Sequence, residues 1–110
     1  MLPQYQSAIV QEQKIVAYLL SFTHRDGRGK AFFFSRFGFR AADWQEFADA
    51  LKQHIKTHEV ATAETTPFGI RYTIEGTLVT PDGRNPSIRT VWFIETGDSI
   101  PRFVTAYPHP

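Results

Sequence analysis

The sequence contains no cysteine. A disulfide framework, a thiolate metal site and a thiol nucleophile are therefore all excluded. No apolar run approaches the roughly 18 residues that a membrane-spanning helix needs, and the N-terminal MLPQYQ has neither the basic nor the apolar region of a signal peptide. We therefore expect a cytoplasmic protein that makes no contact with a membrane.

The sequence also has almost no excess of positive over negative charge, because the net charge is only +1. A balance this small does not by itself indicate a nucleic-acid-binding protein. The distribution is uneven: residues 1–40 hold six Lys or Arg and two acids, whereas residues 41–66 hold two Lys and five acids. This asymmetry is compatible with a basic, RNA-facing side and an acidic, solvated helix, and equally with chance.

Aromatic residues are abundant, with ten Phe, four Tyr and two Trp among 110 residues. A chain of this length forms one ordinary domain, so we assign residues 1–110 to a single domain with its core at about residues 8–108. A domain this small buries roughly two-thirds of its unfolded surface. The aromatic residues must therefore supply much of the stability.

The first half of the chain has three segments of helical character. The apolar face of residues 11–22 consists of Ile15, Val16, Leu19, Leu20 and Phe22. Residues 30–39 repeat Phe at helical spacing and then place Gly38 where a left-handed C-cap residue belongs. Asp43 and Glu46 match a capping box at the start of the third segment. The apolar stripe of that segment is Trp44, Phe47, Ala48, Leu51 and Ile55.

After residue 59 the hydrophobic period changes to two, which is typical of strands. Residues 68–80, 87–95 and 101–108 are predicted strands, and residues 59–64 are expected to form an edge strand. The inward side chains of the first predicted strand are Phe68, Ile70, Tyr72, Ile74 and Leu78. Helices followed by strands predict an α+β fold, with about three N-terminal helices packed on one face of a four-stranded antiparallel meander sheet.

The loop HRDGRGK, which begins at His24, is the first candidate site. Histidine is the usual proton carrier near neutral pH, and Arg25, Arg28 and Lys30 add fixed positive charge. The glycines at positions 27 and 29 leave backbone N–H groups free to approach an anion. These groups suit phosphodiester cleavage, because negative charge builds on the phosphoryl oxygens in the transition state. The alternative is a solvated loop whose basic residues keep it soluble.

The last two predicted strands supply the second set of candidates. Arg89 is suited to bind a phosphate through two hydrogen bonds, while Thr105 and Tyr107 share a face of the last strand and could donate to the same phosphate. Arg71 has the same possible role. The alternatives are a cross-strand packing pair for Thr105 and Tyr107, and a solvent-facing charge paired with a glutamate for Arg89.

Histidines could also bind a metal, since His54 and His58 lie four residues apart on one predicted helix. No third ligand is evident, so we favour cationic or amphipathic residues near a helix C-terminus, where partial negative charge favours them. His109 is expected to lie in a frayed tail. We predict no metal site and no cofactor.

Several blocks of the sequence resemble a bacterial domain family of unknown function. These blocks are KIVAYLL, HRDGRGKAFFFSRFGF, TPFGIRYTIEGTLVTPDGR, IRTVWFI and PRFVTAYP, and the resemblance covers roughly residues 13–108. Members of that family resemble short proteins encoded beside a small partner gene, or the C-terminal domains of polymorphic toxins. By its layout the family is also similar to the barnase–EndoU–colicin–RelE superfamily of ribonuclease toxins.

This resemblance implies a toxin-like, metal-independent endoribonuclease that acts through the RNA 2′-hydroxyl and leaves a 2′,3′-cyclic phosphate. The residue types that match are His24, Lys30, Arg89, Thr105 and Tyr107. Phosphate binding is assigned to Arg25, Arg28 and Arg71, and the expected partners are RNA and a small cognate antitoxin or immunity protein. The alternative is a non-catalytic module that docks such a partner, for example through the acidic helix.

Overall fold

Four antiparallel strands, hydrogen-bonded in the order in which they occur along the chain, form the sheet of this computed structural model, which describes all 110 residues. The strands are β1 (Val60–Thr66), β2 (Gly69–Thr77), β3 (Ser87–Glu95) and β4 (Arg102–Pro108). The helical elements are η1 (Tyr5–Ser7), α1 (Glu12–Lys14), η2 (Ile15–Leu19), α2 (Arg28–Ser35), η3 (Ala41–Asp43) and α3 (Trp44–Thr57). The predicted α+β class and the meander sheet are confirmed.

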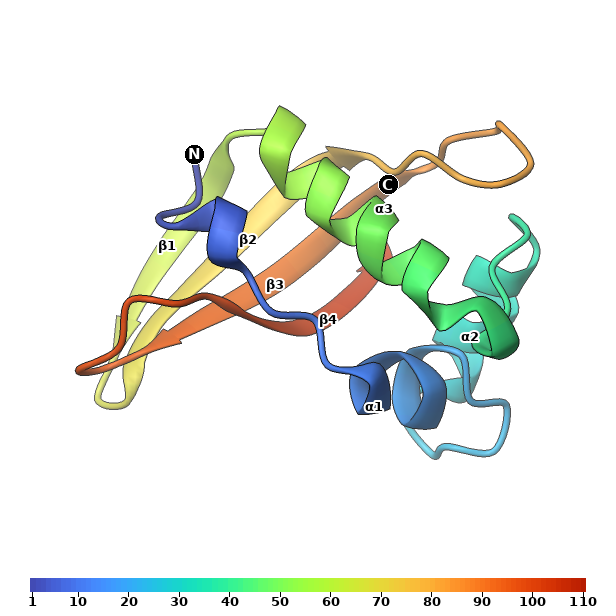
Figure 1. Ribbon diagram of the computed structural model, residues 1–110, viewed down its shortest axis with the longest axis horizontal. Coiled ribbons are helices and arrows are strands. Elements are labelled where there is room, and N and C mark those ends of the chain that lie inside the picture. The colour runs from blue at the N-terminus through green and yellow to red at the C-terminus, as the bar shows by residue number, and fades with distance from the viewer.

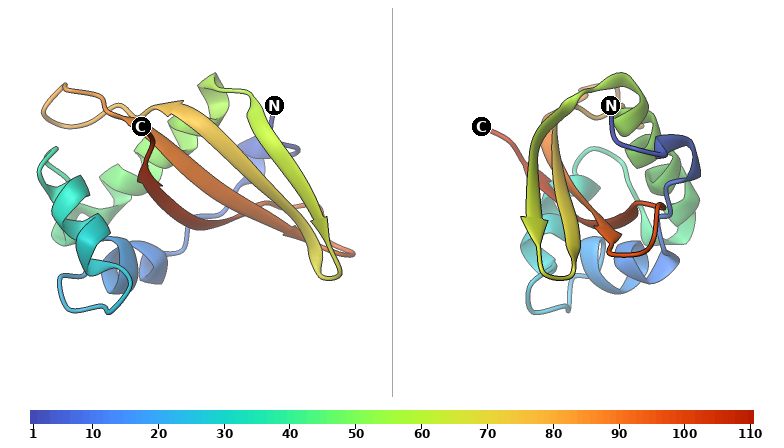
Figure 2. Two further views of the ribbon diagram at one scale, coloured as in Figure 1. Left: turned by 180° about the vertical axis from the view of Figure 1, so that it is seen from behind. Right: turned by 90° about the vertical axis from the view of Figure 1, so that its left-hand side faces the viewer.

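The helices occupy two places around the sheet. Helix α3 crosses one face of the sheet, whereas α1, η2 and α2 gather beside one of its ends (Figure 1). The sheet twists between β1 and β4, as the two further views show (Figure 2), and this is the usual behaviour of paired strands. Because α3 crosses only one face of the sheet, the second face is not covered by this helix.

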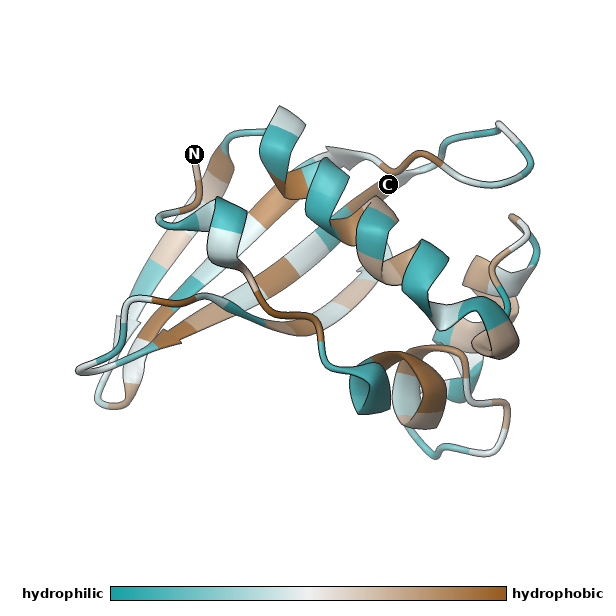
Figure 3. Cartoon of the chain, in the orientation of Figure 1, coloured by the Kyte–Doolittle hydropathy of each residue, from teal (hydrophilic) through white to brown (hydrophobic).

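The core lies between α3 and the sheet. Phe47, Leu51 and Ile55 of α3 are fully buried, and the helix shows a polar side toward the viewer and an apolar side toward the strands (Figure 3). Ile74 and Trp92 meet them from the sheet. The apolar stripe of α3 that its sequence predicts is therefore the principal packing surface of the fold.

The indole of Trp92 is the largest fully buried side chain. Its Nε1–H donates to the Oγ1 of buried Thr90 over 2.9 Å, and its ring packs edge-on against Phe103 with centroids 5.2 Å apart. A buried N–H without a partner is costly, roughly 1–3 kcal/mol. The hydrogen bond to Thr90 therefore satisfies the indole N–H, so that Trp92 can be fully buried in the core.

The N-terminal segment covers the start of the β4 edge. Ile9 bridges Arg102 in parallel orientation; its N–H donates to the carbonyl of Pro101 over 3.0 Å, and its carbonyl accepts from the N–H of Phe103 over 2.9 Å. Unpaired sheet edges promote association between chains. These bonds therefore protect the start of the β4 edge from pairing with another chain.

The first predicted helix is present but is interrupted. It starts as α1 and continues as η2, a π-helical turn in which the N–H of Leu20 donates to the carbonyl of Ile15 over 2.8 Å. The wider turn rotates the following side chains away from the expected face. Phe22, which follows the turn, is exposed, and so is Val16 within it, so their predicted place in the core is wrong.

Two local predictions in the helices have different outcomes. Gly38 has φ +104°, so the left-handed residue after α2 is confirmed, and Phe39 then stacks on Phe47 at 4.4 Å. The capping box of Asp43 and Glu46 is wrong, because Asp43 makes no side-chain cap hydrogen bond. A short 3₁₀ turn, closed by the N–H of Asp43 on the carbonyl of Arg40 over 3.0 Å, takes the place of that cap.

The predicted inward pattern of the first long strand holds except at its start. Ile74 and Leu78 are buried, whereas Phe68 is 77% exposed. Phe68 precedes β2 in a tight turn, where the Oγ1 of Thr66 accepts from the N–H groups of Phe68 and Gly69. The side chain of a turn residue does not follow the alternation of a strand.

Candidate active site

The phenol of Tyr18 joins three segments that are distant in sequence. Its oxygen accepts a hydrogen bond from the Nζ of Lys30 over 2.6 Å and lies 3.0 Å from the Oγ1 of Thr105. The ring of His24 meets the ring of Tyr18 edge-on, with centroids 5.0 Å apart. We call Tyr18, His24, Lys30 and Thr105 the tyrosine cluster. Three of its members are predicted site residues, and the fourth, Tyr18, is not among the sequence-based candidates.

Backbone packing fixes the position of this cluster. Gly27 is buried against η2, and a Cβ at this position would lie 2.0 Å from the carbonyl oxygen of Tyr18. No other residue type fits so close an approach. The N–H of Gly27 also donates to the Nδ1 of His24 over 3.1 Å. The expectation that this amide is free to bind an anion is therefore wrong, because the loop uses it internally.

The hydrogen bonds of His24 determine its tautomer. Its Nδ1 accepts from the N–H groups of Asp26, over 3.0 Å, and of Gly27, over 3.1 Å. A nitrogen that accepts two hydrogen bonds carries no proton, so the neutral ring holds its proton on Nε2. In this geometry the Nε2–H of His24 is available as a hydrogen-bond donor.

The surroundings of Tyr18 act on its acidity in opposite directions. Partial burial raises the pKa of the phenol, but the hydrogen bonds with Lys30 and Thr105 and the positive charges of Lys30 and Lys14 outweigh it. The net result is a pKa below the usual value of 10.0. The phenolate is therefore more accessible here than at an ordinary tyrosine.

Lys30 carries the positive charge of the tyrosine cluster. Its Nζ forms no salt bridge, and its one hydrogen-bond partner is the phenol of Tyr18. A second cation, Lys14, lies 5.8 Å from the centroid of the same ring. No carboxylate neutralises Lys30, so its charge is available to a bound anion.

Arg89 and Tyr107 belong to a second cluster on β3 and β4. The guanidinium of Arg89 pairs with the carboxylate of Glu75, hydrogen-bonds the Nδ1 of His109 over 3.1 Å, and lies 5.7 Å from the ring centroid of Tyr107. We call these four residues the arginine cluster. The alternative interpretation of Arg89 as the partner of a glutamate is confirmed. The expectation of a frayed tail at His109 is wrong, because its Nε2 also lies 3.2 Å from Glu75.

The charges of the arginine cluster are mutually satisfied. Hydrogen bonding from Arg89 holds the pKa of Glu75 below its usual value against the opposing effect of burial, and the charges of Arg89 and His109 act in the same direction. Glu75 and Tyr107 correspondingly raise the pKa of Arg89. The cluster borders a cavity of about 270 Å³ whose other lining residues are Thr62 and Thr73. An anion in this cavity must compete with the Glu75 carboxylate for Arg89.

The two clusters adjoin along β4. Thr105 pairs with Val91, and Tyr107 pairs with Arg89. The intervening Ala106 is fully buried on the opposite side, so Thr105 and Tyr107 share the face that α3 does not cover. Residues two apart on a strand are separated by about 7 Å. No direct contact joins His24 or Lys30 to Arg89.

The remaining predicted cations lie around these clusters. Arg25 and Arg28 are exposed in and just after the His24 loop. Arg71 is exposed on β2 and lines a groove of about 400 Å³ together with Lys14 and Arg102. Because Lys14 also approaches the Tyr18 ring, this groove leads toward the tyrosine cluster.

A sequence signal for Tyr18 exists, because it follows Lys14 by four residues and so shares a helical face with it. That face carries the polar side of residues 11–22. Nothing in the sequence indicates that this face contacts Lys30 or Thr105. The contact arises only when η2, α2 and β4 meet.

The histidine pair at the C-terminal end of α3, with His54 inside the helix and His58 just after it, has a structural role. His54 is 2% exposed, with its Nδ1 3.1 Å from the carbonyl of Thr77, and burial lowers its pKa. Of the expected cationic or amphipathic character, the cationic part is therefore wrong for His54, since burial disfavours the charged ring. His58 places its Nδ1 2.8 Å from the carbonyl of His54. No group of three or more His, Asp or Glu side chains is placed to hold a metal ion.

A family model for a domain of unknown function, DUF6883, matches residues 1–110. The chain belongs to this family. The predicted resemblance to a bacterial domain family of unknown function is thus confirmed at the level of the family. No curated protein matches the chain in sequence.

The fold of this DUF6883 domain occurs in a solved structure. That structure is a contact-dependent growth inhibition toxin–immunity protein complex from Klebsiella pneumoniae 342. The DUF6883 chain superposes on one chain of it with a TM-score of 0.71, covering 93% of this chain and 100% of that one at 18% sequence identity. Similarity at this identity shows a shared fold. The helices of the DUF6883 chain are all too short or too polar to span a bilayer.

Proposed function

We propose that this DUF6883 chain is a toxin-type, metal-independent endoribonuclease that acts through the RNA 2′-hydroxyl and leaves a 2′,3′-cyclic phosphate. The observation that supports this most directly is the Tyr18 phenol, held between the Lys30 ammonium at 2.6 Å and the Thr105 hydroxyl at 3.0 Å, beside His24. The fold shared with a chain of a toxin–immunity complex supports the toxin class.

Lys30 stabilises the negative charge that develops on the phosphoryl oxygens. An ammonium fixed beside a partly buried phenol is already oriented before the substrate arrives, and such preorganised charge is a large contribution to catalysis. Lys30 is well suited to this role because it makes no salt bridge.

Tyr18 accepts the proton of the attacking 2′-hydroxyl. The pKa of the phenol lies below its usual value, so the phenolate forms more readily than at an ordinary tyrosine, and in that form Tyr18 can take the proton while the O2′–P bond forms and the P–O5′ bond breaks. Lys30 then protonates the leaving 5′-oxygen. The proton held by Tyr18 returns to Lys30 through their 2.6 Å hydrogen bond, so both residues regain their starting state.

His24 acts as a hydrogen-bond donor in this scheme. With Nδ1 occupied by two backbone N–H groups, its Nε2–H is the group that can reach a phosphoryl oxygen. We therefore assign it charge stabilisation in place of the general-base role that its residue type alone suggests. Thr105 orients the Tyr18 oxygen through their 3.0 Å contact.

The arginine cluster has an accessory role. Arg89 and Tyr107 contact an adjoining phosphate or base, because they occupy the same uncovered face as Thr105. The Glu75 carboxylate reduces the net attraction of Arg89 for an anion. Arg25, Arg28 and Arg71 hold more distant phosphates by charge, a contribution that depends strongly on salt.

The test uses an oligonucleotide with a single ribonucleotide in an otherwise 2′-deoxy strand, incubated with purified protein in EDTA. Cleavage is expected only after the ribonucleotide, and the product should carry a 2′,3′-cyclic phosphate that mass spectrometry identifies. Total RNA with His24→Ala beside the wild type provides a second assay. The all-deoxy strand, which lacks the nucleophile, is the matched control.

Two results would contradict the proposal. One is intact RNA after incubation with the wild-type protein. The other is equal cleavage by the wild type and by Tyr18→Phe, since a contaminating nuclease would persist in both preparations. Loss of cleavage in EDTA that Mg²⁺ restores would indicate a metal-dependent reaction instead.

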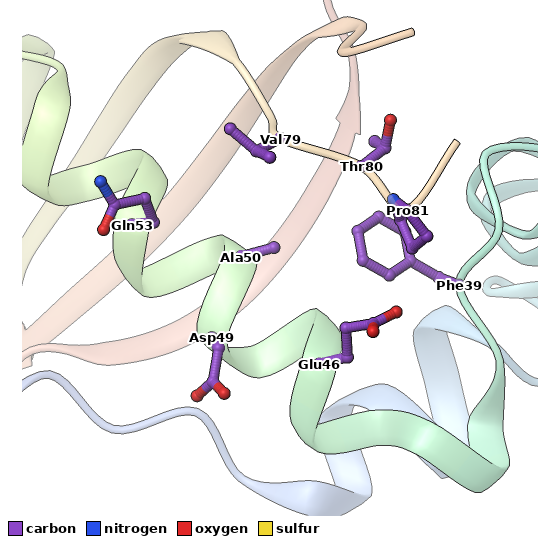
Figure 4. A pocket seen from close by; sticks show the side chains of 8 residues that line it. All are labelled: Phe39, Glu46, Asp49, Ala50, Gln53, Val79, Thr80 and Pro81. Atoms are coloured by element: carbon purple, nitrogen blue, oxygen red, sulfur yellow. The ribbon is translucent and has the colours of Figure 1, made fainter. Parts of the chain in front are cut away.

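A second candidate function, a non-catalytic module that docks a cognate protein, is favoured by a groove on α3. The groove has a volume of about 430 Å³ and lies between α3 and the segment 79–81. Glu46 projects from α3 toward Phe39 and Pro81, whereas Asp49 points away (Figure 4). Val79 is 61% exposed at the rim. Such a surface suits a partner with apolar and basic side chains.

Growth distinguishes the two functions. Expression of a ribonuclease without its inhibitor should arrest the cell, and Tyr18→Phe should relieve the arrest. Expression of a docking module should be harmless in both forms.

A further inference from the structure

An exposed pair of aromatic rings lies next to the tyrosine cluster. Phe22, in the loop after η2, and Phe32, on α2, meet edge-on with centroids 5.0 Å apart. Their exposed fractions are 50% and 60%. A pair that served only to close the loop onto α2 would be expected to bury both rings, because burial supplies most of the stabilisation that such contacts give.

Positive charge surrounds this pair. Arg28 precedes Phe32 by one helical turn and so shares its face of α2, and Arg25 lies in the loop that joins Phe22 to the helix. Residues 21–40 hold five Lys or Arg and a single acid, Asp26. The opposite side of α2 is buried through Ala31 and Phe34.

Another exposed phenylalanine provides the contrast within the molecule. Phe68 is 77% exposed at the turn between β1 and β2. No aromatic ring pairs with it, and the residues from Thr65 to Gly69 include no cation. Isolated exposed apolar residues are common and carry no functional meaning. Among the exposed phenylalanines, only Phe22 and Phe32 combine a paired ring with flanking cations.

We infer that Phe22 and Phe32 form a stacking platform for the bases of single-stranded RNA, with Arg25 and Arg28 holding the neighbouring phosphates. The platform rests on the proposed function, because RNA is the substrate proposed there. Every base has a π face, so stacking tolerates any sequence, while the arginines attract the backbone. Phe, together with Arg, is well suited to this mode of binding.

The occupant is single-stranded because a base in a duplex is already stacked on both sides. Phe22 also lies within two residues of His24, a span of at most about 7 Å between Cα atoms. A base stacked on the platform therefore belongs to a nucleotide close to the phosphate at the tyrosine cluster. The platform thereby selects unpaired regions of RNA for cleavage.

The test measures binding apart from cleavage. Fluorescence anisotropy is recorded with a short 2′-O-methyl RNA, which lacks the nucleophilic hydroxyl and stays intact, and with the same strand annealed to its complement. Phe22→Ala/Phe32→Ala should weaken binding of the single strand about tenfold or more. Phe22→Trp/Phe32→Trp should retain it, and Phe68→Ala, the matched control, should leave it unchanged.

Several outcomes would overturn the inference. These are equal affinity of the double alanine variant and the wild type, tighter binding of the duplex than of the single strand, and no binding of the single strand by the wild type. Duplex preference would indicate charge attraction alone. Thermal unfolding of each variant verifies its fold, and Phe32→Ala alone, at the more exposed of the two rings, should still weaken binding measurably.

The two proposals fail separately. Single-strand binding that depends on the platform, without cleavage of the ribonucleotide-containing strand, would leave the platform standing and remove the nuclease. Cleavage of RNA by the wild type, together with unchanged RNA binding by the double alanine variant, would support the nuclease and remove the platform. Intact RNA binding in that variant, together with loss of inhibition by a cognate protein, would assign the rings to a protein partner and overturn the platform.

Discussion

The two polar clusters of this domain contain similar residue types but treat their positive charge differently. In the tyrosine cluster, Lys30 donates to the phenol oxygen of Tyr18 and forms no salt bridge with a carboxylate. In the arginine cluster, Arg89 is paired with Glu75. A cation beside a phenol can bind an anionic ligand, whereas the charge of a cation beside a carboxylate is already neutralised by that carboxylate. We therefore expect the tyrosine cluster to govern activity and the arginine cluster to govern stability.

The largest expected effect is that of Tyr18→Phe. The change removes one oxygen and keeps the ring that packs against His24 and Gly27. Loss of a proton-transfer group typically costs 10²–10⁴-fold, so the cleavage rate should fall by roughly that factor. Tyr72→Phe, the same change on strand β2, is the control. A rate for Tyr18→Phe within about twofold of the wild type would remove the phenol from the mechanism.

Lys30→Met should follow, with a loss of about 10²–10³-fold, since it removes one preorganised charge from the transition state. Initial rates in EDTA provide the measurement. Lys52→Met on α3 controls for net charge. If the two lysine variants lost activity equally, Lys30 would contribute only to general attraction of RNA.

Arg89→Met should have a smaller effect, a loss of about fivefold, because Glu75 already neutralises the arginine. The same assay measures it beside Lys30→Met. The reverse ranking, with Arg89→Met the more severe, would exchange the roles of the two clusters.

The smallest expected effect concerns stability and pH. The pKa of Glu75 is lower in the folded protein than its usual 4.5. Its ion pair therefore stabilises the fold above that value and loses this contribution as the pH falls through the lower, folded-state pKa. Between pH 7 and pH 3 the urea midpoint of the wild type should fall more than that of Glu75→Gln. Parallel curves would show that the pair does not stabilise the fold.

Much of the fold was predictable because it depends on local patterns. The apolar stripe of α3, the left-handed Gly38 and the alternation in β2 all come from residues close together in sequence. The errors arose where an irregular turn interrupted a helix or preceded a strand. The π turn of η2 exposed Phe22, and the turn before β2 exposed Phe68. The hydrophobic periodicity of the sequence does not reveal such interruptions.

The candidate site was predictable in its residue types but not in its grouping. His24, Lys30 and Thr105 were identifiable from loop chemistry and strand alternation, and so were Arg89 and Tyr107. Their division into two clusters was not, because Glu75 meets Arg89 through strand register. Tyr18 was missed for the same reason: its partners lie 12 and 87 residues away along the chain.

The sequence by itself determined the α+β class, the position of most helices and strands, and the basic character of the region around α2, since each of these is a sum of short-range preferences. Only the tertiary structure decided which cation remains without a carboxylate and which tyrosine meets it. Charge pairing depends on distances of a few ångströms between segments that the chain brings together only when it folds.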